Sequence, residues 1–124
     1  MLRVFVILGS IGAFLSVALG AFGAHGLRGK ISDAMLSIYQ TGVHYQFLHS
    51  LALILAAILS ERLYATGLVA EAGILFVVGI VLFSGSLYAL TLSGVSSLGF
   101  ITPFGGLAFL AGWILLILAA IRGA

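Results

Sequence analysis

The sequence predicts an all-α integral membrane protein, folded as a four-helix bundle with short loops. Three observations predict this class. Hydrophobic residues make up 63% of the 124 residues and charged residues only 6%, whereas a soluble domain carries about 25% charged residues. The apolar residues fall into four runs, each close to the roughly 20 residues that cross a bilayer. Short breaks separate these runs, so consecutive helices are expected to be antiparallel neighbours.

The first apolar run predicts a span over 2–24, with Arg3 as its one charge. A charged start before an apolar run also resembles a signal peptide, but this run is longer than a typical signal core. We therefore expect a permanent first helix. The polar break 25–32 follows it, and its Arg28 and Lys30 are expected to stay in water or among lipid headgroups.

The second helix is expected over 33–59, because Ser32 or Asp33 can cap its start. At about 1.5 Å per residue, this helix is longer than the hydrocarbon core of a bilayer. We therefore place 33–40 in the interface and the span itself at 41–59.

The third span is expected over 67–92, after the short turn 60–66. The loop 93–102 carries no charge, and its end supplies an N-cap followed by a proline at the first helical position, Thr102-Pro103. The fourth span is therefore expected over 103–121. The whole chain, 1–124, then forms a single transmembrane domain with both termini on one side.

Positive residues favour the cytoplasmic side of a membrane. Arg3, Arg62 and Arg122 fall on the side of the termini, whereas Arg28 and Lys30 fall on the other side. We therefore expect a multi-pass protein of the cell (inner) membrane with cytoplasmic termini.

Several classes of function lack their residues in this chain. There is no cysteine, which excludes disulfides and thiolate-bound metals. The basic residues are scattered rather than clustered, so no nucleic-acid partner is expected. No catalytic triad, phosphate loop, zinc-protease motif or carboxylate pair is present. We therefore expect neither enzymatic activity nor a cofactor.

The densest polar patch lies in the second helix, and eight residues here and elsewhere are candidates for a polar or ligand-binding site: His25, Tyr39, Gln40, His44, Tyr45, Gln46, His49 and Glu71. At 100° per residue, Tyr39 and Gln46 share one stripe, while His44 and His49 lie about 140° apart. One interpretation is a buried ligand pocket or proton relay. The other is hydrogen bonding between helices that fixes their register.

Metal or haem binding is the weaker hypothesis for the histidines. His25 and His44 both lie toward the first loop, and two imidazoles can bind haem, or zinc together with a carboxylate. Glu71, however, enters its span from the opposite side, where it can reach the interface or pair with Arg62. We predict no metal site, and a membrane redox enzyme using His25 and His44 stays a third hypothesis.

Small residues at four-residue spacing mark faces where membrane helices approach closely. The predicted helix-packing residues are Gly12, Ser16, Gly20, Gly105 and Gly112. They serve either packing within one bundle or contact with a second copy of the chain.

Four segments together resemble a known family: Gly20–Leu27, Tyr39–His49, Phe83–Tyr88 and Ile101–Trp113. They are similar, in order and over essentially the whole chain, to the small four-helix membrane proteins of domain of unknown function 423, whose eukaryotic relatives include transmembrane protein 256. The resemblance implies a bacterial inner-membrane protein with four spans. It implies no established activity and no catalytic residues.

Two functions follow as expectations. The first is a small multi-pass membrane protein that binds lipid or protein as an assembly component, alone or as a homo-oligomer. The alternative is an oligomeric channel, transporter or proton-handling protein that uses the polar patch of the second helix. The expected partners are membrane lipid, another copy of the chain or another membrane protein.

Overall fold

The computed structural model describes residues 1–123. All of its regular elements are helical: α1 (Leu2–Phe22), a π-helical segment η1 (Gly23–Leu27), α2 (Asp33–Leu59), α3 (Thr66–Gly79), a second π-helical segment η2 (Ile80–Ser84), α4 (Gly85–Ser93), a 3₁₀ segment η3 (Ser96–Phe100) and α5 (Thr102–Gly123). The predicted all-α class is confirmed.

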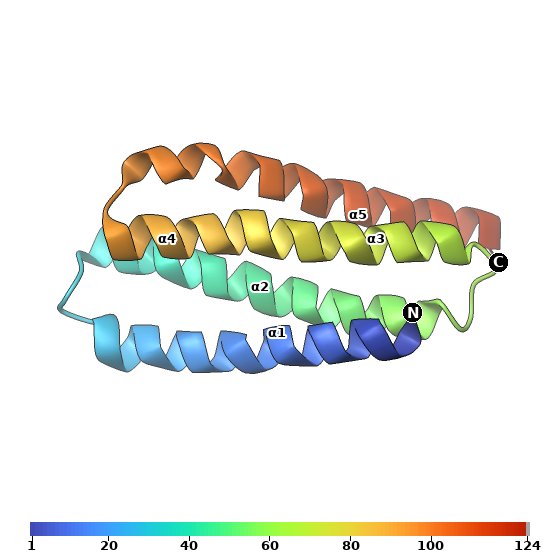
Figure 1. The fold of residues 1–124 in the computed structure, drawn as a ribbon, viewed down its shortest axis with the longest axis horizontal. Helices are drawn as coiled ribbons and strands as arrows, with labels where there is room; N and C mark the ends of the chain where they lie inside the picture. The colour runs from blue at the N-terminus through green and yellow to red at the C-terminus, as the bar shows by residue number, and fades with distance from the viewer. Residues whose placement is uncertain (124) are drawn as a thin grey trace.

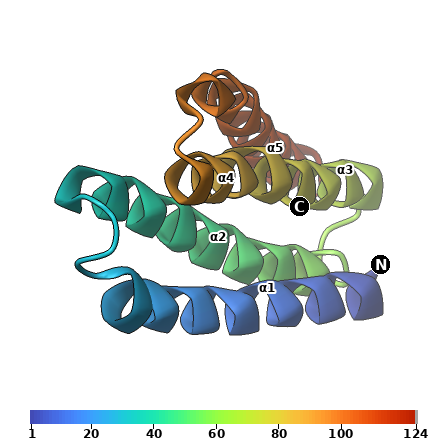
Figure 2. The same ribbon diagram turned by 60° about the vertical axis from the view of Figure 1, so that its left-hand side comes forward.

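These elements join into four rods that are each long and apolar enough to cross a membrane: Leu2–Leu27, Asp33–Leu59, Thr66–Ser93 and Ser96–Gly123. Consecutive rods run in opposite directions, and both chain ends lie at the same end of the bundle (Figure 1). In both ribbon views α1 and α5 lie outermost, with α2 and the α3–α4 rod between them (Figures 1 and 2). The predicted four-helix architecture is therefore confirmed.

The helix boundaries differ from the expected ones at the end of the first rod, in the loop before the fourth rod, and by one residue at each end of the third rod, which is Thr66–Ser93 instead of 67–92. The structure also decides between the two expected caps of α2. The first helix does not stop at Ala24 but continues as a π-helix to Leu27. The loop 93–102, expected to be irregular, holds a 3₁₀ turn, and α5 begins at Thr102, one residue before the expected start. Ser32 rather than Asp33 caps α2, because its Oγ accepts a hydrogen bond from the Met35 amide at 3.1 Å.

Two close helix pairs build the bundle, and glycine sets the spacing in both. In the α1–α2 pair, a Cβ on Gly9 would lie 2.6 Å from the Ser50 carbonyl oxygen, and one on Gly12 would overlap Ser50 Oγ. The second pair is α5 with the rod formed by α3 and η2. A Cβ on Gly105 of α5 would lie 2.7 Å from Phe83 Cα in η2, and one on Gly112 would lie 2.6 Å from Phe76 Cε1 in α3. Each pair therefore depends on glycine: Gly9 and Gly105 let two backbones meet, while Gly12 and Gly112 make room for a side chain of the facing helix.

The apolar core fills the space between these pairs, mainly near the end that holds the termini. Phe5 of α1, Leu53 of α2, Phe76 of α3 and Phe109 of α5 belong to this core. The α2 helix is the most enclosed, with 44% of its best apolar window buried against 17% for α1. Large apolar side chains instead cover the outer surfaces of all four rods, as a bilayer requires.

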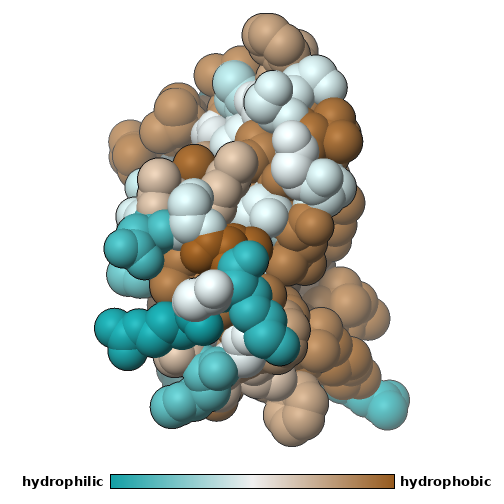
Figure 3. Space-filling view, turned by 90° about the vertical axis from the view of Figure 1, so that its left-hand side faces the viewer, coloured by the Kyte–Doolittle hydropathy of each residue, from teal (hydrophilic) through white to brown (hydrophobic). Residues whose placement is uncertain are grey.

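The end of the bundle away from the termini is polar but unevenly charged. Figure 3 looks onto this end, where strongly hydrophilic atoms gather on one part of the surface and pale, weakly polar atoms cover much of the rest. The α1–α2 loop at this end contains Arg28 and Lys30, both exposed, whereas the α4–α5 connection 94–101 carries no charge.

Candidate functional site

Gln46 joins three helices through its side-chain amide. Its Nε2 donates to the carbonyl oxygen of Gly12 in α1 at 2.9 Å. Its Oε1 accepts from the hydroxyl of Tyr88 in α4 at 2.6 Å. Gln46 is almost completely buried, so both amide groups would be costly to leave unpaired in an apolar interior. This residue therefore fixes the register of α2 against both neighbours.

Tyr39 and Ser84 extend the same internal network toward the α1–α2 loop. The fully buried Tyr39 donates from its hydroxyl to the Leu19 carbonyl oxygen at 2.6 Å. Gly23 makes room for the ring, because a Cβ there would lie 2.5 Å from Tyr39 Cε1. Ser84, the last residue of η2, donates to the Gly42 carbonyl oxygen at 2.6 Å. The network thus holds α2 to both adjacent rods.

His49 forms a second internal link, to α5. The Trp113 indole Nε1–H donates to His49 Nε2 at 3.0 Å. Because an indole nitrogen only donates, Nε2 must be the acceptor, and the ring proton then lies on Nδ1. Nδ1 donates in turn to the Tyr45 carbonyl oxygen at 2.9 Å. The ring stacks on Phe109 with centroids 3.6 Å apart, so this histidine is a neutral, fully paired part of the core.

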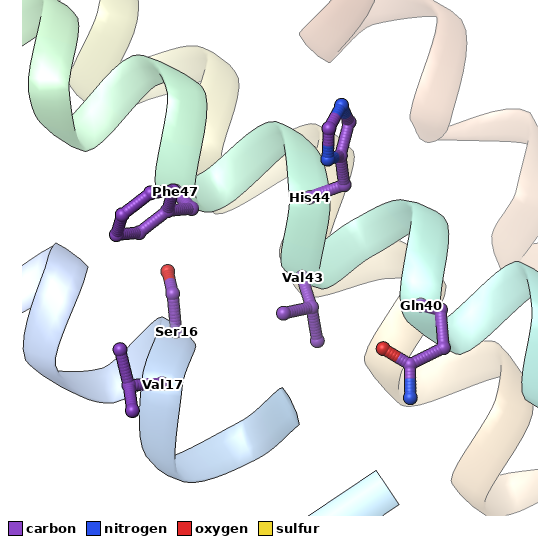
Figure 4. A pocket seen from close by; sticks show the side chains of 6 residues that line it. All are labelled: Ser16, Val17, Gln40, Val43, His44 and Phe47. Atoms are coloured by element: carbon purple, nitrogen blue, oxygen red, sulfur yellow. The ribbon is translucent and has the colours of Figure 1, made fainter. Parts of the chain in front are cut away.

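The opposite flank of α2 carries polar side chains of a different kind. An open groove of about 440 Å³ runs between α1 and α2, lined by Ser16, Val17, Gln40, Val43, His44 and Phe47 (Figure 4). Gln40, Val43 and Phe47 form its α2 wall, and His44 lies at its rim, on the side of α2 away from α1. His44 is exposed and Gln40 half-buried. Within residues 1–123, neither side chain has a hydrogen-bond partner, in contrast to Tyr39 and Gln46.

The remaining candidates lie apart from this groove. His25 is exposed in η1, and Glu71 is exposed near the start of α3, at the end opposite the polar patch. Tyr45 is 38% exposed on the other flank of α2, where its ring contacts Phe83 at a centroid distance of 4.7 Å. Residues 1–123 contain no cluster of three or more His, Asp or Glu side chains arranged to hold a metal. The structure therefore divides the predicted polar patch among three surfaces of one helix.

The predicted helix-packing residues all face other helices of the same chain. A Cβ on Gly20 would lie 3.3 Å from Val43 of α2. Ser16 is buried, and its hydroxyl donates to the Gly12 carbonyl oxygen at 2.8 Å. Gly12, Gly105 and Gly112 occupy the crossings described above.

Sequence reasoning missed Tyr88 as the partner of Gln46 and Ser84 as the partner of Gly42. The available signal was the four-residue spacing of Ser84 and Tyr88 in one apolar run, since this spacing puts both hydroxyls on one face of a helix. At 100° per residue Ser50 falls on the same stripe of the second helix as Tyr39 and Gln46, but it was not among the candidate site residues. Its buried Oγ has no hydrogen-bond partner within residues 1–123.

The four apolar rods and the hydrogen bonds between them define a small α-helical membrane protein with several spans. The chain belongs to the family described as "Protein of unknown function (DUF423)", whose model matches residues 19–106. This confirms the resemblance to that family seen in the sequence.

Its relatives are membrane proteins of similar length. It is 52% identical to the UPF0382 membrane protein YwdK of Bacillus subtilis over 98% of both chains. It is 46% identical to the UPF0382 membrane protein SAB0533 of Staphylococcus aureus and 41% identical to SSP2132 of Staphylococcus saprophyticus, again over 98% of this chain and 98–99% of the relatives. No solved structure matches the chain.

Proposed function

We propose that this protein is a non-enzymatic lipid-binding component of the cell membrane, and that it holds a bilayer phospholipid in the groove between α1 and α2. One observation carries the proposal. Gln40 and His44 border an apolar groove on the lipid-facing side of the bundle without a partner in residues 1–123. His44 falls within the expected span 41–59, where a polar side chain is costly unless paired, and Gln40 is the last residue of the expected interfacial segment 33–40.

The spacing of these two residues suits a lipid. They are four positions apart, so their backbones lie about one helical turn, roughly 6 Å, apart along the axis, with Gln40 on the wall of the groove and His44 at its rim. Gln40 lies level with the end of α1, because Gly23 approaches its amide there. The pair therefore falls where a phospholipid offers ester and phosphate oxygens as acceptors. The other lining residues Val17, Val43 and Phe47 offer an apolar surface to an acyl chain.

The lipid-retention experiment replaces the two polar groups without removing their bulk. Native mass spectrometry of protein released from lipid nanodiscs would compare the wild type with the double variant Gln40→Leu, His44→Leu. We expect the wild type to retain a reproducible lipid and the variant to lose it. The matched control is Thr41→Val, which removes an exposed polar group on a different face of α2. Equal lipid retention in the wild type and the double variant would contradict the proposal.

We also propose that the protein lies in the inner membrane with cytoplasmic termini. Arg3, Arg62 and Arg122 at the end that holds the termini support this orientation, against Arg28 and Lys30 at the other. The chain has no cysteine, so single-cysteine variants report unambiguously. In intact cells stripped of any outer barrier, a membrane-impermeant maleimide should label Ser96→Cys and spare Glu61→Cys. The reverse pattern would invert the orientation.

The channel hypothesis has less support. The inward-facing Gln46, Tyr39 and His49 are engaged with neighbouring helices, which favours a structural role. Proteoliposomes should therefore show no ion flux above that of empty vesicles, and flux lost in Gln46→Leu would restore the hypothesis. The same native mass spectra give the copy number. The packing glycines serve contacts within the chain, so we expect a monomer to be the folded unit.

A further inference from the structure

We infer that the lipid held in this groove is an anionic phospholipid, selected by Arg28 and Lys30 in the loop that joins α1 to α2. This inference rests on the proposed function, because it names the chemical class of the ligand of the same groove. The ligand is then a bilayer lipid whose headgroup has a net negative charge.

The connection between the groove and the loop follows from the chain itself. The two walls of the groove are α1 and α2, and 28–32 is the segment that links them. Gln40 lies against the beginning of η1, because a Cβ on Gly23 would be 2.9 Å from Gln40 Nε2. Gln40 is therefore at the end of the groove nearest this loop, and a headgroup bound at Gln40 would lie on the loop side of the groove.

The loop has a defined shape rather than a free one. Gly29 has a φ of +83°, which favours glycine, and a side chain there would meet open space. The Lys30 and Ile31 amides both donate to the Leu27 carbonyl oxygen, at 2.9 and 3.3 Å. Leu27 itself is buried. This turn holds the backbones of Arg28 and Lys30 in place while their side chains stay exposed and able to reach a phosphate.

Charge favours an anionic over a zwitterionic lipid at this place. Two cations stand on the loop against one carboxylate, Asp33, which lies in the first turn of α2. The neighbouring α4–α5 connection adds no charge of either sign, and Figure 3 shows the strongly hydrophilic atoms gathered on one part of this end. The positive potential is therefore local to the α1–α2 side. A zwitterionic headgroup would place its own cation beside Arg28 and Lys30, so its electrostatic attraction to the loop would be weaker.

The experiment measures preference separately from retention. Full-length protein in nanodiscs of equal parts phosphatidylglycerol and phosphatidylcholine is released in the native mass spectrometer, and the two retained lipids are counted. We expect the wild type to favour phosphatidylglycerol and the variant Arg28→Gln, Lys30→Gln to retain lipid without that preference. Each cation near an anionic surface contributes about fivefold to binding, so the preference should fall by roughly an order of magnitude or more.

The matched control removes two cations from the opposite end of the bundle, in Arg3→Gln, Arg62→Gln. It should keep the wild-type preference for phosphatidylglycerol. Raising the salt concentration should weaken this preference in the wild type and in the control, and should leave the loop variant unchanged. A wild type that retains both lipids equally, or a loop variant that keeps the preference, would overturn the inference while leaving lipid binding intact. Loss of all lipid from the wild type would instead overturn the proposed function.

Discussion

The polar side chains of α2 differ in their hydrogen bonding between its inner side and the side of the groove. On the inner side, both amide groups of Gln46 are hydrogen-bonded to neighbouring helices, and both ring nitrogens of His49 are hydrogen-bonded within the protein. On the side of the groove, Gln40 and His44 have no partner within residues 1–123. The inner polar groups therefore hold the bundle together, and the outer ones are the groups that we propose bind a lipid.

The largest expected effect comes from adding a methyl group on the inner side of α5. In Gly105→Ala the new Cβ would overlap the backbone of Phe83, which cannot move as a flexible side chain can. We expect a loss of about 3 kcal/mol or more in unfolding free energy, or failure to fold. Gly106→Ala is the control, because its nearest neighbour, Phe83 Cδ2, would be 4.0 Å away. Reversible unfolding in detergent measures both, and equal stability would show that α5 does not pack this closely.

The second effect concerns the amide that joins three helices. Gln46→Leu removes two hydrogen bonds and strands the Tyr88 hydroxyl, whereas Tyr88→Phe removes one. Hydrogen bonds between membrane helices contribute about 0.6–2 kcal/mol each. We therefore expect Gln46→Leu to lose about 1–4 kcal/mol and Tyr88→Phe about half as much. A double-mutant cycle checks the pairing, since non-additive losses are expected only if the two side chains interact.

Hydropathy alone could predict the four helices, because a bilayer leaves few alternatives to a helix for a long apolar segment. It could not predict the two π-helical segments. The second of these segments ends at Ser84, whose hydroxyl bonds to the Gly42 carbonyl oxygen of the facing helix, and hydropathy carries no information on such a contact. The sequence likewise located the polar patch, but angular positions on one helix could not predict which other helix each polar residue faces.

Gly42 and Trp113 show the same limit at single residues. A glycine within a helix can allow a bend, but Gly42 lies inside the continuous helix α2, where its carbonyl oxygen accepts from Ser84 and a Cβ would lie 3.0 Å from Tyr88 Cε1. Trp113 in mid-span needed a partner for its indole N–H. That partner, His49, is 64 positions away in the chain, and no local pattern can indicate such a pairing.

A smaller effect is expected at the link between α2 and α5. His49→Leu removes the acceptor of the Trp113 indole N–H and should lower the unfolding free energy by about 0.5–1.5 kcal/mol, with packing against Phe109 largely kept. Trp113 is the single tryptophan, so its indole N–H resonance reports the change directly. That resonance should shift in His49→Leu and stay in place in His44→Leu. An unmoved resonance in His49→Leu would show that the bond is absent in the membrane.

The smallest change in stability is expected for substitutions in the groove. Comparing this change with the effect of Gln46→Leu is the most direct test of the difference between the two sides of α2. Gln40→Leu and His44→Leu remove polar groups that have no partner within residues 1–123, so each should alter the unfolding free energy by no more than about 0.5 kcal/mol. Because an unpaired polar group facing lipid is unfavourable, the sign of any change in lipid-free detergent should be stabilising. Gln46→Leu, on the same helix and with the same substitution, should be destabilising. If Gln40→Leu lost as much stability as Gln46→Leu, Gln40 would have to be part of the internal network, and the groove would lose the group that marks it as a binding site.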